Sequence, residues 1–474
     1  MRTYHSPLQS RYASEEMQYL FSPEKKFKTW RLLWVILAET EKELGLNITD
    51  EQIQDLRKYI DNINYEVAEA REKEVRHDVM AHIYAYGQQA EKAKGIIHLG
   101  ATSCYVTDNT DLIVMNDALR IIQNKVVAII KKLKDFALEY KDLPTLGFTH
   151  FQAAQLTTVG KRATLWIHEL MLDLAQIENQ LQAAYLLGSK GTTGTQASFL
   201  ELFSGDHNKV KQLDFMIAEK LGYKGVYPVS GQTYSRKIDE QYSNILKGIA
   251  VSSHKFANDL RLLQSLKEME EPFAKNQVGS SAMAYKRNPM RSERMTGLAR
   301  FVITNAQNAA LTAAEQWFER TLDDSSNKRL AVSECFLATD TILNIYLNIA
   351  DGLVVYPKVI EKHIQEELPF MATENILMKA VLKGGDRQVL HEKIREYAMQ
   401  AGLEVKQEGK ENRLLEMIQK DKSFGLSPEE ITQTLDAKLF IGRASQQTEE
   451  YIKDIVEKKI NEYSNILETY ELNI

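Results

Sequence analysis

The sequence predicts a mainly α-helical protein built around a bundle of long helices. Three observations favour this fold class. Only nine of 474 residues are proline, well below the usual share of about 5%, and proline disrupts helix interiors. Apolar residues from Leu112 to Tyr140 recur at alternating spacings of three and four over four heptads, as in a helix-bundle seam. No strand-like alternation competes over comparable lengths.

The first hundred residues predict short and medium helices. In Ser22-Pro23-Glu24, a helix N-cap is followed by a proline suited to the first helical position and by an acid in the first turn. We expect this helix to end before Gly45, a typical residue just after a helix end. Thr49 and Gln52 form a capping-box pattern that predicts a second helix start.

The middle of the chain predicts long helices. Residues 112–140 form a helix of about 43 Å at 1.5 Å per residue, and Pro144 closes it. A second pattern covers 159–185 and stops at the glycine-rich stretch 188–194. Further helical patterns run through 234–265, 291–316 and 327–352. We therefore expect a bundle of about five long helices, suited to packing between subunits.

Prolines that interrupt the helical patterns suggest three domains. Pro357 and Pro369 mark a boundary after the bundle, and shorter charged helices follow. We expect an N-terminal helical domain at 1–103, a central long-helix bundle with a signature loop at 104–356, and a C-terminal helical domain at 357–474.

The composition excludes several classes of protein. The chain has 59 basic and 65 acidic residues, a net charge of −6, so it has no general attraction for nucleic acid or anionic membranes. Its two cysteines form no disulfide framework, which fits a reducing compartment. The start lacks the apolar region of a signal peptide, and no run approaches 18 uncharged apolar residues. We expect a cytoplasmic protein that binds neither nucleic acid nor membrane.

Common cofactor and metal motifs are missing from the sequence. No Gly-x-Gly-x-x-Gly follows a strand pattern, and no Walker sequence or His-Glu-x-x-His occurs. His77 and His82 are five residues apart, a spacing that does not place both on one helix face. No Gly-x-Ser-x-Gly elbow appears. We expect neither a metal nor a cofactor.

Polar residues cluster in four segments, whereas an amphipathic helix alternates polar and apolar residues. These segments are 76–82, 98–109, 145–152 and 279–294. Three of them lie at the ends of long helices, where loops carry functional groups on a rigid scaffold. In the fourth, small residues permit motion, Lys286 and Arg287 add positive charge, and Asn288-Pro289 stops the loop before a helix. These are the properties of a closing, anion-binding lid.

Each segment also has a purely structural interpretation. A lone histidine such as His150 is more often a hydrogen-bonded structural residue. Thr102 and Ser103 are typical helix-capping residues. The arginines that follow Pro289 could form a solvated helix face. These alternatives stay open on the residues alone.

A resemblance makes the segments more specific. The stretch Gly-Ser-Ser-Ala-Met-x-Tyr-Lys-Arg-Asn-Pro at 279–289 resembles the signature of the fumarase/aspartase superfamily. Further blocks resemble the adenylosuccinate lyases of the form found in animals, at 10–14, 76–78, 98–103, 190–199, 290–294, 317–325 and 442–447. The matches therefore cover nearly the whole chain, in order.

The resemblance implies a three-domain, mainly α-helical fold whose central bundles pack together in a homotetramer with composite active sites. It implies cleavage of adenylosuccinate to AMP and fumarate, and of the succinyl-carboxamide ribotide SAICAR to AICAR and fumarate. Both reactions belong to purine nucleotide biosynthesis, and neither needs a cofactor or a metal.

The implied reaction is a β-elimination, which needs a base, an acid and groups that stabilise the growing negative charge. The resemblance implies that Ser280 is the base and His150 the acid. Ser281 is adjacent, and the sequence alone does not separate the two serines. The residues implied to hold the succinyl carboxylates are Lys286, Asn288, Thr102 and Ser103.

The other substrate contacts implied by the resemblance include five arginines, which suit bidentate contacts to phosphate and carboxylate. We therefore expect a locally positive cleft in an acidic protein. These contacts are Arg11, Tyr12, Arg76, His77, Asp78, Gln232, Arg294, Arg320, Ser325 and Arg329.

Two positions depart from the family pattern, because Ala153 and Ala284 stand where proline is usual. Losing proline should loosen each loop.

Two alternatives remain beside the main interpretation. Another superfamily lyase, such as argininosuccinate lyase, would have no phosphate for Arg320 and Arg329 to bind. A non-catalytic scaffold would be free to lose the acid, the base and their charged neighbours.

Overall fold

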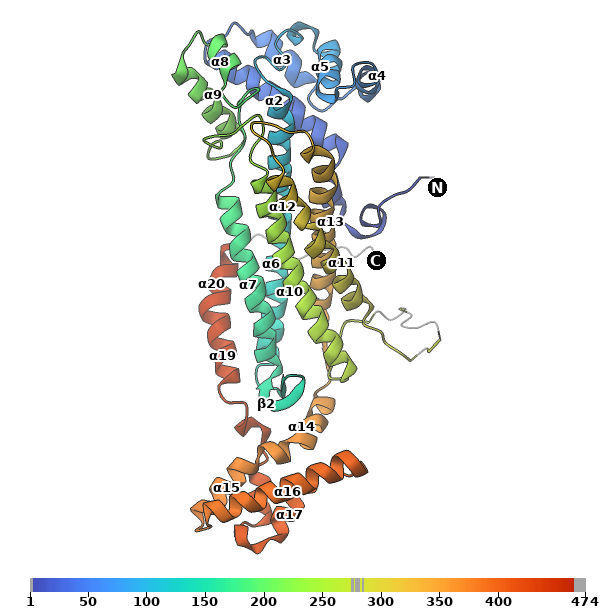
Figure 1. Cartoon of the computed structure of the whole chain (residues 1–474), viewed down its shortest axis with the longest axis vertical. Helices are drawn as coiled ribbons and strands as arrows, with labels where there is room; N and C mark the ends of the chain where they lie inside the picture. Colours follow the sequence, from blue (N-terminus) through green and yellow to red (C-terminus); the bar gives the residue numbers. More distant parts are fainter. Residues whose placement is uncertain (1–2, 274–276, 278–281, 284, 464–474) are drawn as a thin grey trace.

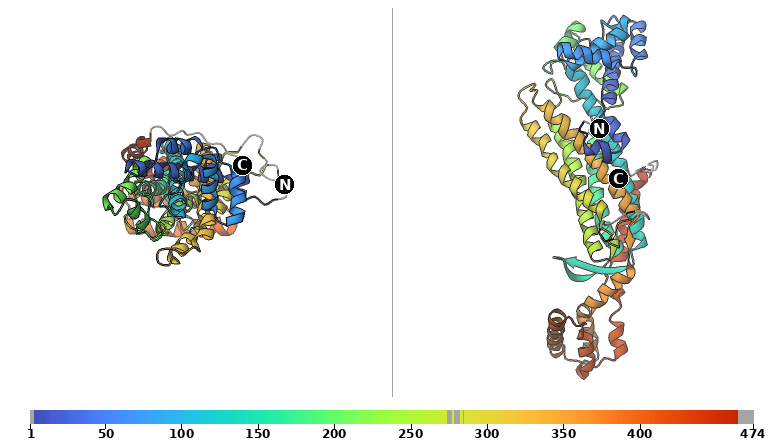
Figure 2. Two further views of the ribbon diagram at one scale, coloured as in Figure 1. Left: turned by 90° about the horizontal axis from the view of Figure 1, so that it is seen from above. Right: turned by 90° about the vertical axis from the view of Figure 1, so that its right-hand side faces the viewer.

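The computed structural model describes residues 3–273, 277, 282–283 and 285–463. The molecule is elongated, with a central bundle of long helices between two groups of shorter helices (Figure 1). A view from the side shows the same three layers along the long axis (Figure 2). The mainly α-helical fold predicted from the proline content and the apolar seam is confirmed.

The N-terminal part begins with a short π-helix, η1 (Leu8–Tyr12). The predicted caps are present, since the Ser22 side chain accepts a hydrogen bond from the Lys25 amide and Thr49 forms a capping box with Gln52. Five α-helices make up this part: α1 (Glu15–Leu20), α2 (Pro23–Glu43), α3 (Asp50–Lys58), α4 (Tyr65–Val75) and α5 (Asp78–Gln89).

Five helical segments form the bundle over the described ranges, as the periodicity predicts. The third predicted pattern, 291–316, is divided at Ala306 into two helices. The segments are α6 (Ser103–Glu139), α7 (Val159–Gln182), α10 (Lys237–Ser265), α11 (Met290–Asn305) with α12 (Gln307–Ala314), and α13 (Asp324–Asp351).

Helix α6 begins at Ser103, earlier than the predicted start at Leu112. The reason is that its first turns bury polar side chains, which carry no apolar periodicity. Asp108, Asn109 and Thr110 are all buried. Apolar spacing therefore located the seam but underestimated the helix.

An antiparallel hairpin follows α6 where the sequence predicted only a loop. Strand β1 (Pro144–Thr149) pairs with β2 (Gln152–Thr158). The turn residues His150 and Phe151 have φ of 54° and 56°, the signs that a two-residue type I′ turn requires. Such turns are usually Asn-Gly, so His-Phe gave no hairpin signal. The hairpin projects from the bundle (Figure 2).

The remaining helices lie at the two ends of the bundle or along it. Pro357 occupies the first turn of α14, whereas Pro369 lies inside that helix near its end. These α-helices and the second two-stranded sheet are α8 (Ala197–Leu202), α9 (His207–Lys220), β3 (Met269–Glu270), β4 (Val354–Val355), α14 (Pro357–Met371), α15 (Thr373–Leu382), α16 (Arg387–Glu408), α17 (Leu414–Lys420), α18 (Pro428–Gln433), α19 (Ala444–Tyr451) and α20 (Glu457–Ile460). Short 3₁₀ or π segments are η2 (Glu91–Ala93), η3 (Lys422–Phe424), η4 (Ala437–Leu439), η5 (Ile452–Val456) and η6 (Asn461–Tyr463).

Three apolar cores hold these elements together. The bundle core also includes Ile452, Val456 and Ile460, because the chain returns along α7 after the C-terminal helices (Figure 1). The N-terminal core includes residues of α8 and α9, which follow α7 in sequence. The third core lies within α15–α18 and their neighbours. The domain boundaries after 103 and 356 stay a prediction.

Among the described residues, one helix is long and apolar enough to cross a membrane. This helix is α13, and 78% of its most apolar window is buried inside the structure. Because core helices pass the same test of length and composition, α13 is weak evidence for a membrane span.

One buried carboxyl group stands out in the N-terminal core. Glu41 on α2 is fully buried, and neither carboxyl oxygen has a hydrogen-bond partner within the described part of the chain. Burial raises the pKa of Glu41 to about 9, because a low-dielectric environment disfavours the charged form. The folded protein therefore keeps Glu41 neutral at pH 7, whereas the unfolded chain ionises it.

We expect the free energy of unfolding to fall between about pH 5 and about pH 9 because of Glu41. A carboxyl whose pKa is raised by folding binds more protons in the folded state, so stability is lost as pH rises. Glu41→Gln should reduce this slope, by up to about 1.4 kcal/mol per pH unit. Urea unfolding at several pH values measures it. Glu69→Gln, on an exposed position of α4, is the control, and equal slopes in both variants would contradict the assignment.

Candidate active site

A cavity of about 470 Å³ lies where α6 and α13 begin, below the N-terminal helices. Its walls come from α2, α5, α6, the segment before α10 and the connection that leads into α13. These elements are far apart in sequence and meet only in the fold. Seven of the residues singled out by the resemblance line it: His77, Asp78, Ser103, Gln232, Arg320, Ser325 and Arg329.

The turn between α4 and α5 brings two of these residues into the cavity. Arg76 ends α4 with a φ of 53°, and His77 caps α5 by accepting a hydrogen bond from the Met80 amide at 3.3 Å. The other ring nitrogen, Nε2, lies 3.4 Å from the Ser103 hydroxyl. The Asp78 carboxylate is 3.8 Å from the Lys26 ammonium. The tight helix–helix turn therefore presents an imidazole and a carboxylate together.

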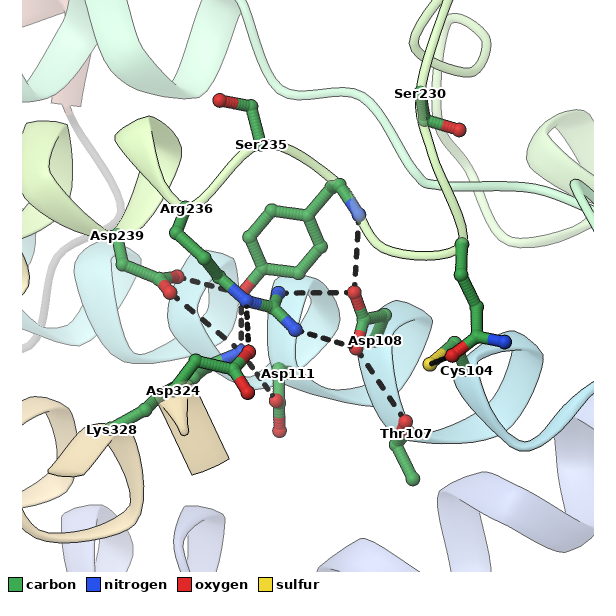
Figure 3. Close-up of polar contacts among 12 residues, drawn as sticks. Cys104, Thr107, Asp108, Asp111, Ser230, Ser235, Arg236, Asp239, Asp324 and Lys328 are labelled. Atoms are coloured by element: carbon green, nitrogen blue, oxygen red, sulfur yellow. Dashed lines mark hydrogen bonds and ion pairs between the residues drawn. The ribbon is translucent and has the colours of Figure 1, made fainter. Parts of the chain in front are cut away.

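A buried ion-pair network forms one side of the cavity (Figure 3). The guanidinium of Arg236 donates two hydrogen bonds to Asp108, at 3.0 and 3.2 Å, and a third, from Nε, to Asp324 at 2.6 Å. Burial alone would lower the pKa of Arg236, but nearby acidic groups, above all Asp108, raise it well above its usual value. Arg236 is therefore a permanent cation clamped between two carboxylates.

A second group of contacts extends the network. The Lys328 ammonium lies 2.7 Å from an Asp111 oxygen and donates to the Tyr234 hydroxyl at 2.6 Å. That hydroxyl donates to Asp239 at 2.6 Å. Burial and Arg236 would lower the pKa of Lys328, but Asp111 and Asp239 raise it above its usual value. Figure 3 shows Lys328 beside these acidic groups.

Sequence reasoning missed most of this network. Asp108 lies in the polar segment 98–109, and Asp324 lies in the block 317–325, but the sequence assigns no role to either of them, to Arg236 or to Lys328. A usable signal exists in the acidic residues Asp108 and Asp111, three apart and therefore on one face at the start of α6. Spacing alone did not show which cations they meet, because those come from α13 and from the segment before α10.

The charge of the cavity is nearly balanced. Among its lining residues five are basic and four are aspartates, which leaves a small excess of positive charge. The excess has the predicted sign. Its basic residues are Lys26, Arg236, Arg320, Lys328 and Arg329, so two lysines and a buried arginine contribute beside the predicted arginines.

Another set of predicted residues lies outside the cavity lining. Arg294 on α11 points at the ring of Tyr12, with 5.7 Å from the guanidinium carbon to the ring centroid, and Arg11 lies 5.8 Å from the same centroid. Arg76 and Thr102 adjoin lining residues in sequence. Lys286 and Asn288 precede α11. Ser280, Ser281 and Ala284 lie outside the described residues.

The hairpin that carries the predicted acid, His150, lies at the opposite end of the bundle from the start of α6 (Figure 1). Ser103 at the start of α6 lines the cavity, and the hairpin that carries His150 begins after the end of α6. A helix of 37 residues spans about 55 Å at 1.5 Å per residue. One chain therefore does not bring His150 to the predicted site residues that line the cavity. His150 is exposed at the tip of the hairpin.

Comparison with known proteins defines the class of this fold and site. Residues 21–304 match the family model described as lyase, and residues 369–451 match the model of the adenylosuccinate lyase C-terminus. The first match covers more than half of the chain, so the protein is a lyase.

Full-length relatives identify the family within that class. The chain is 53% identical over 476 aligned residues to the adenylosuccinate lyase of Saccharomyces cerevisiae, covering 99% of each chain. It is 52% identical to that of Schizosaccharomyces pombe, covering 98% of this chain and 97% of the other. The one from Schistosoma mansoni is 45% identical, covering 98% and 97%. The chain belongs to the adenylosuccinate lyase family.

Solved structures support the fold. The 3-carboxy-cis,cis-muconate lactonizing enzyme from Pseudomonas putida matches with a TM-score of 0.83 at 19% identity, covering 96% of this chain and 99% of that one. The fumarate lyase from Mesorhizobium sp. BNC1 matches with a TM-score of 0.79 at 20% identity, covering 95% and 99%. The fumarase/aspartase-like architecture expected from the resemblance is therefore confirmed.

Cys104 lies in the cavity wall beside Ser103, but its thiol is buried. Burial raises the pKa of Cys104 to about 12, and burial also raises that of Cys335 to about 11. Only thiolates react rapidly with alkylating agents. We expect iodoacetamide at pH 8 to leave both cysteines of the native protein unmodified and to label both after unfolding in urea. Mass spectrometry measures the labelling, and rapid modification of native Cys104 would contradict its burial.

Proposed function

We propose that this chain cleaves adenylosuccinate to AMP and fumarate, and SAICAR to AICAR and fumarate, in purine nucleotide biosynthesis. The observation that carries the proposal is the cavity, where seven predicted substrate contacts from separate segments converge. Arg320, Ser325 and Arg329 cluster around the start of α13, and guanidinium and hydroxyl groups suit a phosphate. Such a cluster favours a phosphorylated substrate over the argininosuccinate alternative.

The proposed chemistry is a β-elimination that needs no cofactor. Ser280 takes the proton from the carbon beside a succinyl carboxylate, the carbon–nitrogen bond breaks, and His150 protonates the leaving nitrogen. The negative charge that develops on the carboxylate needs fixed donors and cations. We assign Lys286, Asn288, Thr102 and Ser103 to this role. His77 and Asp78, at the rim of the same cavity, contact the substrate.

We further propose that the active site is shared between subunits of a homotetramer. The separation of His150 from the cavity along α6 supports this arrangement, because an intact site then needs His150 from another copy of the chain. The bundle also exposes large apolar side chains, among them several on α7, α10 and α11, as expected of a surface that other subunits cover. These are Leu165 and Leu172 on α7, Val251 and Leu262 on α10, and Phe301 on α11. The number four comes from the resemblance.

We also propose that the enzyme is cytoplasmic and that its partners, apart from its own copies, are small nucleotides. Both cysteines, Cys104 and Cys335, are buried free thiols, which supports a reducing compartment. The small charge excess of the cavity suits a single nucleotide better than a nucleic acid backbone, which needs an extended basic surface.

The purified protein should convert adenylosuccinate to equal amounts of fumarate and AMP. His150→Ala should lower turnover by at least ~10²-fold, the usual scale for a positioned proton-transfer group. His207→Ala replaces another exposed histidine, at the start of α9, and should leave turnover unchanged. Absorbance assays of both products measure this. Failure to cleave adenylosuccinate would reject the proposed reaction, and near-normal turnover by His150→Ala would reject the assigned acid.

Shared sites predict complementation between two weakened variants. His150→Ala and Arg320→Ala lie at opposite ends of one chain, so hybrids contain some sites with both residues intact. After subunit exchange of an equal mixture, about a quarter of wild-type activity should return at low substrate, the product of two independent halves. Each variant taken alone through the same exchange is the control. Verified exchange with no gain in activity would mean that both residues act from one chain.

A further inference from the structure

Arg320 is held in the cavity by one nitrogen of its guanidinium. Its NH1 nitrogen donates to both oxygens of Asp324, at 2.9 and 3.0 Å, and to the Thr321 carbonyl at 2.9 Å. Within the described ranges, Nε and NH2 of Arg320 have no hydrogen-bond partner. The side chain lines the cavity and remains 23% exposed. One edge of the guanidinium is thus fixed and another is left for a ligand.

Asp324 is fixed from its other side by Arg236. Arg236 Nε donates to Asp324 at 2.6 Å, while its two terminal nitrogens hold Asp108. The four side chains therefore form a row of alternating charge, Asp108–Arg236–Asp324–Arg320. The side chains of Asp108, Arg236 and Asp324 are at most 4% exposed. All four residues line the cavity, and Arg320, the last member of the row, is the one with appreciable exposure.

The row joins three helix beginnings. Asp108 lies in the second turn of the long helix α6, Arg236 directly precedes α10, and Asp324 is the first residue of α13. The Tyr234 amide also donates to Asp108, at 3.1 Å. Each carboxylate is therefore bound from two directions, and neither can turn without breaking a buried ion pair.

We propose that Asp324 and Arg236 are positioning residues that orient the open edge of Arg320 toward the phosphate of the bound nucleotide. This inference rests on the proposed function. An arginine already held in its binding geometry loses little side-chain freedom when the anion arrives. The carboxylate of Asp324 thereby aids anion binding, although its own charge repels an anion.

The charge of Asp324 and its positioning of Arg320 predict opposite changes in the affinity for AMP, so a binding measurement separates them. If Asp324 acted only through its charge, Asp324→Asn would strengthen AMP binding. If it positions Arg320, the same variant weakens AMP binding. We expect the Kd of AMP to rise roughly tenfold, the scale of one charge-assisted hydrogen bond. The Kd of adenosine, which lacks the phosphate, should change less than about twofold.

Two further variants keep the result independent of folding defects. Asp324→Glu retains the charge but shifts the carboxylate by one methylene, so it should also weaken AMP binding. Arg236→Lys retains the cation but cannot bridge two carboxylates with a planar fork, and it should raise the KM for adenylosuccinate more than it lowers kcat. Asp421→Asn is the matched control, since Asp421 accepts from Lys393 and Tyr397 in the C-terminal helices.

Calorimetric titration of the full-length protein with AMP and with adenosine measures these effects. Tighter or unchanged AMP binding by Asp324→Asn would overturn the proposal, and so would equal losses for AMP and adenosine. Unchanged AMP binding by a folded Asp324→Glu would overturn it as well. If the wild type bound AMP but did not cleave adenylosuccinate, the proposed function would fail, while the comparison of AMP with adenosine would still decide the positioning role.

Discussion

The length of α6 is the constraint on which the rest of the structure depends. Its first turns carry Ser103, Asp108 and Asp111 to the cavity, its middle buries the apolar seam against α7 and α13, and its end leads into the hairpin that carries His150. A continuous helix fixes the separation of these features, because its rise per residue is constant. The cavity and the hairpin of one chain are consequently held apart.

The polar residues buried on α6 fix the alignment of this helix with its neighbours in the bundle core. Asn109 exchanges hydrogen bonds with both backbone groups of Gly188, and Asn116 accepts from the Tyr242 hydroxyl at 2.6 Å. An unpaired buried amide is costly, whereas an apolar seam tolerates sliding. These pairs thus favour one alignment of α6 with α10 and with the segment after α7, the alignment in which Arg236 meets Asp108.

The sequence made the bundle and several helix ends predictable, because apolar spacing and capping residues are local signals. Ser22, Thr49 and the Leu112–Tyr140 seam behaved as those signals imply. The start of α6 and the hairpin were not predictable in this way. Buried polar turns lack periodicity, and His150-Phe151 is not a recognisable turn sequence. Seven residues that the resemblance singled out lie in the cavity, but the ion pairs around them depend on tertiary contacts between distant segments.

The turn of the hairpin places stability and chemistry in conflict. Left-handed backbone at two successive residues with side chains costs about 1–3 kcal/mol each, and Phe151 is bulky and 54% exposed. Asn-Gly would fold the same turn with less strain, but it would remove the imidazole. Sequence drift toward a more stable hairpin therefore leads away from an imidazole at this tip, and the strained turn persists although a relaxed one is a double substitution away.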